Sequence, residues 1–157
     1  MGARSTALAT QFEQAVAEFA AAIEKCPDGH WKAVPVGSWT VAATAQHVAG
    51  QFPLEREYIV AAAEGRELPA YSMDDINGMN DRRAAKELGT SKAEALKTLR
   101  DGGSSMAAYI RGLDDSQLDR KAKLPLAGGA EVTTQQLIEG GVLIDHVKSH
   151  LPTLRAS

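Results

Sequence analysis

The chain has 157 residues, of which 44% are hydrophobic and 24% are charged, and its formal net charge is −3. These values are typical of one globular domain with a substantial core, so we expect residues 1–157 to form a single domain. The slight negative charge disfavours binding to nucleic acid or to an anionic membrane, and no stretch reaches the ~20 apolar residues that a membrane span needs. The single cysteine, Cys26, excludes an internal disulfide framework and fits a reducing compartment. We therefore expect a cytoplasmic protein.

The first predicted helix runs from about Ser5 to Lys25. Alanine is abundant and aromatic residues make up only 5% of the chain, which favours helices over sheets. Apolar residues recur in this segment at steps of three and four, as on one helix face: Leu8, Phe12, Ala15, Phe19, Ile23 and Cys26. Pro27 and Gly29 end the pattern.

The second predicted helix starts at Thr40, a suitable N-cap, and ends near Ala63. Its core face consists of Val41, Ala45, Val48 and Phe52. A half-polar row runs beside this face and consists of Thr44, His47, Gln51, Leu54 and Tyr58. Pro53 interrupts the pattern and predicts a kink or a short break.

A third helical region is predicted over residues 73–113. It divides into two pieces just before Ser91, because Ser91 and Glu94 have the spacing of a capping box. Gly102 and Gly103 weaken the second piece as a helix, but glycine would also let a neighbouring helix approach closely.

The last predicted helix starts at Thr133 or Thr134 and ends near Leu151, where Pro152 limits it. Residues 114–132, which precede it, form a long polar connection without credible strands. Four amphipathic helices and no strands predict an all-α fold, a four-helix bundle.

The strongest local signal for chemistry is the pair His146 and His150 on the last helix. Residues four apart lie on one helix face, so both imidazoles can bind one ion at about 2.0–2.1 Å per Zn–N bond. Such a pair alone is also typical of two partly buried histidines near a helix end. His47 on the second helix supplies the third ligand that a metal site between facing helices needs. Three neutral imidazoles leave a coordination position open, which is typical of catalytic zinc, although nickel, iron and manganese also bind imidazole.

These residues resemble those of the DinB-like superfamily, which includes thiol-dependent transferases and the N-terminal domain of mycothiol-dependent maleylpyruvate isomerase. The resemblance covers nearly the whole chain and rests on three short motifs: Trp39-Thr40 followed by His47, Asp75-Ile76-Asn77, and Thr133-Thr134 opening a helix with His146 and His150. It implies a bundle with a crossover between the second and third helices, and often a homodimer. It also implies one divalent metal ion, zinc or nickel first, on His47, His146 and His150. In the thiol-transferase branch, the open coordination position binds a low-molecular-weight thiol such as mycothiol or bacillithiol.

Two polar residues are predicted to face the site. Gln51 lies one turn after His47, and Glu139 lies two turns before His146 on a continuous helix. Each could bind an imidazole N–H or a group of the cofactor or substrate. A boundary position that reaches solvent is the alternative for both residues.

Other polar residues have two interpretations each. Asn77 and Asn80 lie where the resembling isomerase domains often carry asparagine, but a capping or turn role is as good an explanation. Arg82 and Arg83 could bind a carboxylate of a thiol cofactor or substrate, although we favour a solvated helix face. Tyr58 could line a pocket, but packing in the core is the favoured role.

The sequence favours a metal-dependent S-transferase or isomerase that acts through a small thiol on an electrophilic substrate. A metal-dependent hydrolase is the second enzyme hypothesis, because a metal ion also activates water. A non-catalytic metal-binding stress protein of the same fold stays open, as does a helical bundle with incidental histidines. Scattered basic residues disfavour nucleic acid as a partner.

Overall fold

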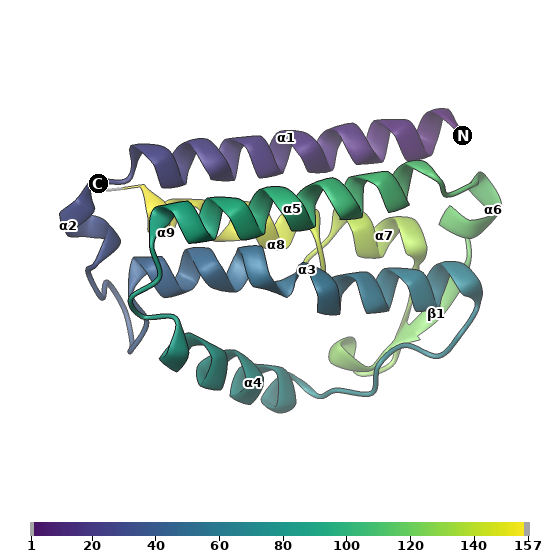
Figure 1. The fold of residues 1–157 in the computed structure, drawn as a ribbon. Helices are drawn as coiled ribbons and strands as arrows, with labels where there is room; N and C mark the ends of the chain where they lie inside the picture. Colours follow the sequence, from purple (N-terminus) through teal and green to yellow (C-terminus); the bar gives the residue numbers. More distant parts are fainter. Residues whose placement is uncertain (1, 156–157) are drawn as a thin grey trace.

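Long helices packed side by side form the bundle of the computed structural model, which describes residues 2–155 (Figure 1). The fourth position is shared by three short helices in series. The bundle helices are α1 (Ala3–Lys25), α3 (Val41–Glu64), α5 (Lys92–Arg111), α7 (Thr134–Glu139), α8 (Ile144–Ser149) and α9 (Leu151–Leu154). The largest buried side chains come from all four positions and include Phe12, Phe19, Phe52, Ile59, Leu99, Met106, Ile138 and Leu154. The predicted all-α four-helix bundle is confirmed.

Helices α3 and α5 run in the same direction, so the chain must return along the bundle between them (Figure 1). Residues 65–91 make this return and contain α4 (Met73–Lys86), which packs against α3. The Ser72 hydroxyl accepts the Asp75 N–H, and the Asp75 carboxylate accepts the Ser72 N–H, which begins α4 with a capping box. The crossover that the family resemblance implied is therefore present, and it includes a helix as well as a loop.

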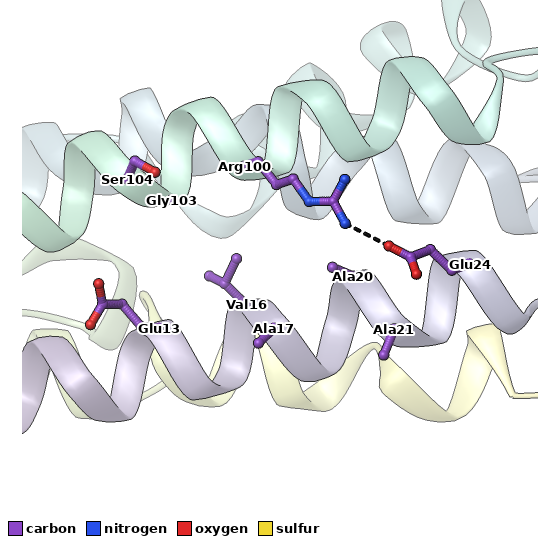
Figure 2. A pocket seen from close by; sticks show the side chains of 9 residues that line it. All are labelled: Glu13, Val16, Ala17, Ala20, Ala21, Glu24, Arg100, Gly103 and Ser104. Atoms are coloured by element: carbon purple, nitrogen blue, oxygen red, sulfur yellow. Dashed lines mark hydrogen bonds and ion pairs between the residues drawn. The ribbon is translucent and has the colours of Figure 1, made fainter.

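Close packing between α1 and α5 depends on glycine. Figure 2 shows Val16 of α1 facing Gly103 of α5, where a Cβ atom on Gly103 would lie 3.2 Å from Val16 Cγ1. A Cβ atom on Gly102 would lie 2.9 Å from Cδ2 of Phe52 in α3. The expected close approach is confirmed at both glycines. Helix α5 begins after Ser91, whose hydroxyl accepts the Glu94 N–H at 3.1 Å, but the capping box is only half formed, because the Glu94 carboxylate accepts from the Thr90 hydroxyl at 3.1 Å instead of from Ser91.

Helix α3 carries the central histidine and starts at the predicted cap. The Thr40 hydroxyl accepts the Ala43 N–H at 3.0 Å and donates to the Leu88 carbonyl at 2.8 Å. The helix continues through Pro53 without the break that the sequence allowed. It ends at Gly65, whose φ of 73° is the left-handed conformation that favours glycine.

The prediction that residues 114–132 lack strands was wrong. After the short helix α6 (Asp115–Leu118), β1 (Lys121–Leu124) and β2 (Ala130–Thr133) form an antiparallel hairpin closed by the 3₁₀ turn η1 (Pro125–Ala127). Leu124 is the only buried residue of the two strands, so the hairpin has almost no alternating apolar pattern to reveal it.

The last helix is broken, contrary to the prediction of one continuous helix. Gly140 leaves the helical conformation with φ −88° and ψ −157°, and α8 begins only at Ile144. The Gly140 carbonyl then accepts the N–H groups of Leu143 and Asp145, so the break is hydrogen-bonded. Two adjacent glycines, Gly140 and Gly141, have low helix propensity and explain the position of the break.

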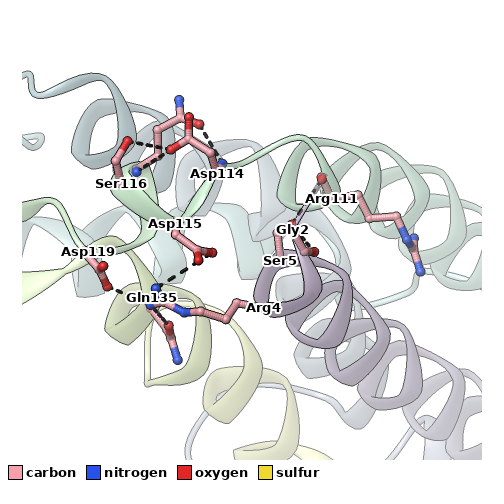
Figure 3. A network of polar contacts seen from close by, with 10 residues as sticks. Gly2, Arg4, Ser5, Arg111, Asp114, Asp115, Ser116, Asp119 and Gln135 are labelled. Atoms are coloured by element: carbon pink, nitrogen blue, oxygen red, sulfur yellow. Dashed lines mark hydrogen bonds and ion pairs between the residues drawn. The ribbon is translucent and has the colours of Figure 1, made fainter.

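A polar network joins the start of α1 to the segment around α6 (Figure 3). Arg4 donates to Asp119 at 2.7 Å and to Gln135 of α7. The Ser5 hydroxyl donates to the Gly2 carbonyl at 3.0 Å. At the other end of the bundle, the short helix α2 (Asp28–Trp31) leads into α3. None of the helices within residues 2–155 is long and apolar enough to cross a membrane.

Candidate metal centre

The structure brings together the three predicted histidines from two positions of the bundle. His47 lies in the second turn of α3, His146 lies on α8, and His150 is the residue directly after α8. The Nε2 atom of His146 lies 3.1 Å from Nε2 of His47 and 3.2 Å from Nε2 of His150. One ring nitrogen of each histidine lies within 4.8 Å of the other two.

These separations fit a metal ion. Two imidazole nitrogens bound tetrahedrally to zinc at 2.0–2.1 Å lie about 3.3 Å apart, and cis nitrogens of an octahedral ion lie about 3.0 Å apart. The observed 3.1 and 3.2 Å lie between these values. The three rings meet edge to face, with centroids 4.9–5.3 Å apart, so each can direct a lone pair toward a common point.

Burial keeps the three imidazoles neutral. It lowers the pKa of His47 to about 3 and that of His150 to about 4, and it also lowers the pKa of His146. His146 and His150 lower the pKa of His47 further, and His146 lowers that of His150, because like charges repel. Neutral imidazole is the form that binds metal, so the cluster needs no deprotonation near pH 7.

Glu55 is a residue of the site that the sequence analysis missed. It is only 4% exposed, and its Oε1 atom accepts the Nδ1–H of His146 at 3.0 Å. This hydrogen bond places the proton of His146 on Nδ1 and leaves the Nε2 lone pair for the cluster. Desolvation raises the pKa of Glu55 well above its ordinary value. The available signal was a carboxylate one turn after Gln51, within an otherwise apolar helix.

The histidines form one side of a pocket of about 370 Å³. Trp39 packs against His47 with ring centroids 5.3 Å apart, and its Nε1–H donates to Asp81 of α4 at 3.1 Å. The lining residues come from α3 and the segment before it, from α4, from the hairpin turn, and from α8 with the residues on either side of it: Trp39, His47, Gln51, Leu54, Glu55, Tyr58, Met73, Ile76, Asn77, Asn80, Leu126, Gly141, Val142, His146 and His150.

Gln51 lines this pocket, and Arg83 orients it. Arg83 Nη1 donates to the Gln51 Oε1 atom at 3.0 Å and to the Gly50 carbonyl at 3.1 Å. Arg83 is half-buried, so the favoured solvated position was wrong for it, whereas Arg82 is exposed. Because its oxygen accepts from Arg83, Gln51 keeps its amide N–H groups for a ligand in the pocket.

Glu139 is not brought to the site. It is exposed at the end of α7, where its charge acts on Arg4, and it is absent from the residues that line the pocket within the described chain. Its predicted position assumed one continuous helix, and the break at Gly140 removes the regular spacing between Glu139 and His146. Asn77 and Asn80 do line the pocket, and Ser72 caps α4 in their place.

The comparisons with known proteins identify the family. A family model described as the DinB superfamily matches residues 11–154. The chain belongs to the DinB superfamily. A search of curated proteins finds no match.

Solved structures of three proteins have the same fold as this chain. YfiT from Bacillus subtilis, described as a probable metal-dependent hydrolase with an unusual four-helix bundle topology, is 17% identical with a TM-score of 0.77; the match covers 98% of this chain and 86% of YfiT. A mycothiol-dependent maleylpyruvate isomerase is 14% identical with a TM-score of 0.74, and the match covers 97% of this chain but only 61% of the isomerase. A protein from Clostridium difficile 630 is 12% identical with a TM-score of 0.73, and the match covers 99% of this chain and 95% of that one. At these identities the likeness shows a shared fold.

Proposed function

We propose that the protein is a metal-dependent enzyme that holds one divalent ion, zinc or nickel, on His47, His146 and His150. We further propose that it acts as an S-transferase or isomerase with a low-molecular-weight thiol of the mycothiol or bacillithiol type. The convergence of three neutral imidazole nitrogens at 3.1 and 3.2 Å, beside an open pocket, carries the proposal. A divalent ion held there would lower the pKa of a bound thiol and so supply a nucleophile at neutral pH.

The residues around the histidines have distinct roles in this proposal. Glu55 orients His146 through its Nδ1–H, and Trp39 packs against the ring of His47. Gln51, held by Arg83, offers amide N–H groups to the thiol cofactor or the substrate. Leu54 and other apolar side chains of the pocket exclude water from the nucleophile.

Hydrolysis is the second candidate, because water would be activated at the same open position. The description of YfiT, whose fold this chain shares, as a probable metal-dependent hydrolase favours it. The mycothiol-dependent isomerase favours the thiol reaction in the same way. The two reactions differ in one requirement, since only S-transfer needs an added thiol.

Metal content and thiol dependence test the proposal together. Mass spectrometry of the purified protein should find about one equivalent of zinc or nickel, retained in His30→Ala and lost in His47→Ala. His30 is a matched control because it contacts the Thr153 carbonyl, outside the cluster. The loaded protein should conjugate mycothiol or bacillithiol to 1-chloro-2,4-dinitrobenzene. Ester hydrolysis without thiol would favour the hydrolase instead, and metal without either activity would favour a non-catalytic binding protein.

Equal metal content in His47→Ala and the wild type would refute the site. The predicted homodimer, the single-domain organisation and the cytoplasmic location stay predictions.

A further inference from the structure

Besides Nδ1 of His47, two buried polar atoms of pocket-lining residues have no hydrogen-bond partner within residues 2–155. They are the hydroxyl oxygen of Tyr58 and the Oε2 atom of Glu55, the carboxylate oxygen that His146 does not use. Tyr58 is 2% exposed and Glu55 is 4% exposed, and both side chains line the pocket. Buried polar groups are almost always hydrogen-bonded, so two free ones in one pocket indicate a place for a ligand group or an ordered water.

The Glu55 carboxyl group lies on the far side of the His146 ring from the histidine cluster. Glu55 binds the Nδ1 side of the His146 ring, whereas the cluster forms on its Nε2 side. Tyr58 follows Glu55 by three residues on α3, which places both on the same helix face. A molecule in the pocket can therefore have one end at the histidines and a polar group at Glu55 and Tyr58.

The surroundings of these atoms disfavour an anionic group. Among the residues described as lining the pocket there is no lysine or arginine. Arg83, on the neighbouring α4, donates through Nη1 to Gln51 and to the Gly50 carbonyl. Its charge acts on His47 at the histidine end of the pocket, whereas no cation among the described residues shifts the pKa of Glu55 or Tyr58. Leu54, Ile76 and Val142 supply apolar walls, in which a carboxylate would lose its hydration without gaining a counter-ion.

We propose that Tyr58 and Glu55 form a subsite that binds an uncharged hydroxyl or primary amide group of the substrate. The Tyr58 hydroxyl donates to the oxygen of that group, and Glu55, in its ionised form, accepts the O–H or N–H of the group at Oε2. The substrate would then be a partly apolar, uncharged molecule with a hydroxyl or amide group some distance from its reactive centre. This substrate class rests on the proposed function.

Three probes of similar shape test the subsite: benzamide, benzyl alcohol and benzoate. Their dissociation constants are measured by ligand-observed NMR on the full chain, with and without zinc. The metal-free arm is decisive, because benzoate could also bind a metal ion through its carboxylate. Benzamide and benzyl alcohol should bind the metal-free protein at least tenfold more tightly than benzoate does.

Tyr58→Phe removes only the hydroxyl and should weaken benzamide binding about fivefold, the effect of one net hydrogen bond. Tyr109→Phe is the matched control: Tyr109 is a partly buried tyrosine of α5 outside the pocket lining, and its variant should bind like the wild type. Equal benzamide affinity in Tyr58→Phe and the wild type would overturn the proposal. The proposal would also be overturned if benzoate bound as tightly as benzamide, or if a bound water occupied the subsite and no probe displaced it. Failure to bind zinc would refute the proposed function but would leave these metal-free results valid for the subsite.

Discussion

The Nδ1–H of His146 donates to Oε1 of Glu55 at 3.0 Å, so a buried carboxylate orients one of the three clustered imidazoles. Carboxylates in this position raise the basicity of a metal-binding histidine, and their loss typically costs 10–100-fold in metal affinity. We expect Glu55→Gln to weaken zinc binding by about tenfold, measured by competition with a chromogenic chelator. Glu57→Gln is the control, because Glu57 is exposed on the same helix outside the pocket. An unchanged zinc affinity in Glu55→Gln would mean that the hydrogen bond does not support the site.

The protein without metal should lose stability at acidic pH because of His47. Its pKa is about 3 when folded, below the ordinary value of 6.5 that applies when the chain is unfolded. Between these values the unfolded state binds a proton that the folded state does not, so acid favours unfolding. As the pH falls below 6.5, His47 should lower the free energy of unfolding by about 1.4 kcal/mol per pH unit. Above pH 6.5, His47 is neutral in both states and causes no such loss.

Urea unfolding of the metal-free protein at several pH values between 7 and 5 measures this slope. The His47→Gln variant provides the reference, because the carboxylates titrate in both proteins. The variant should show a shallower slope by about 1.4 kcal/mol per pH unit. Parallel slopes would show that His47 binds a proton in the folded state.

Gly102 and Gly103 should respond differently to alanine. In Gly102→Ala, the new Cβ would lie 2.9 Å from the buried ring of Phe52. Overpacking of this kind costs about 1–3 kcal/mol of stability, which exceeds the gain of about 1 kcal/mol from the higher helix propensity of alanine. In Gly103→Ala, the contact is 3.2 Å to the half-buried Val16, and the two effects nearly cancel. Thermal and urea unfolding should show a net loss of about 1 kcal/mol only in Gly102→Ala. Equal stabilities of the two variants would contradict this packing.

Thr40 joins the start of α3 to the turn before α5. Thr40→Ala removes both the cap on Ala43 and the bond to the Leu88 carbonyl, and it should cost about 1–2 kcal/mol of unfolding free energy. Thr40→Ser keeps the hydroxyl and should lose far less. Denaturant unfolding of the two variants beside the wild type compares the costs, and similar losses in both would indicate a role for the methyl group instead.

Periodic apolar residues allowed the long helices to be predicted, and the histidines were predictable because two of them share one helix face. The break at Gly140 was missed because apolar residues on both sides continue a helical spacing, and this error also misplaced Glu139. The hairpin was missed because residues 121–133 bury only Leu124. Glu55 was missed because its role depends on a partner 91 residues away in the sequence. Local patterns reveal elements, whereas contacts between distant segments appear only in three dimensions.

The two halves of the pocket come from different parts of the chain, because α4 lies in the crossover and the histidines lie on the bundle helices. The histidine-bearing half is part of the bundle core, whereas the opposite wall belongs to α4, which buries only Ile76 and Ala84. Substitutions at Met73, Asn77 or Asn80 therefore alter what the pocket accepts at little expense to folding. In a family that shares one scaffold, such a wall can change while the three histidines stay the same.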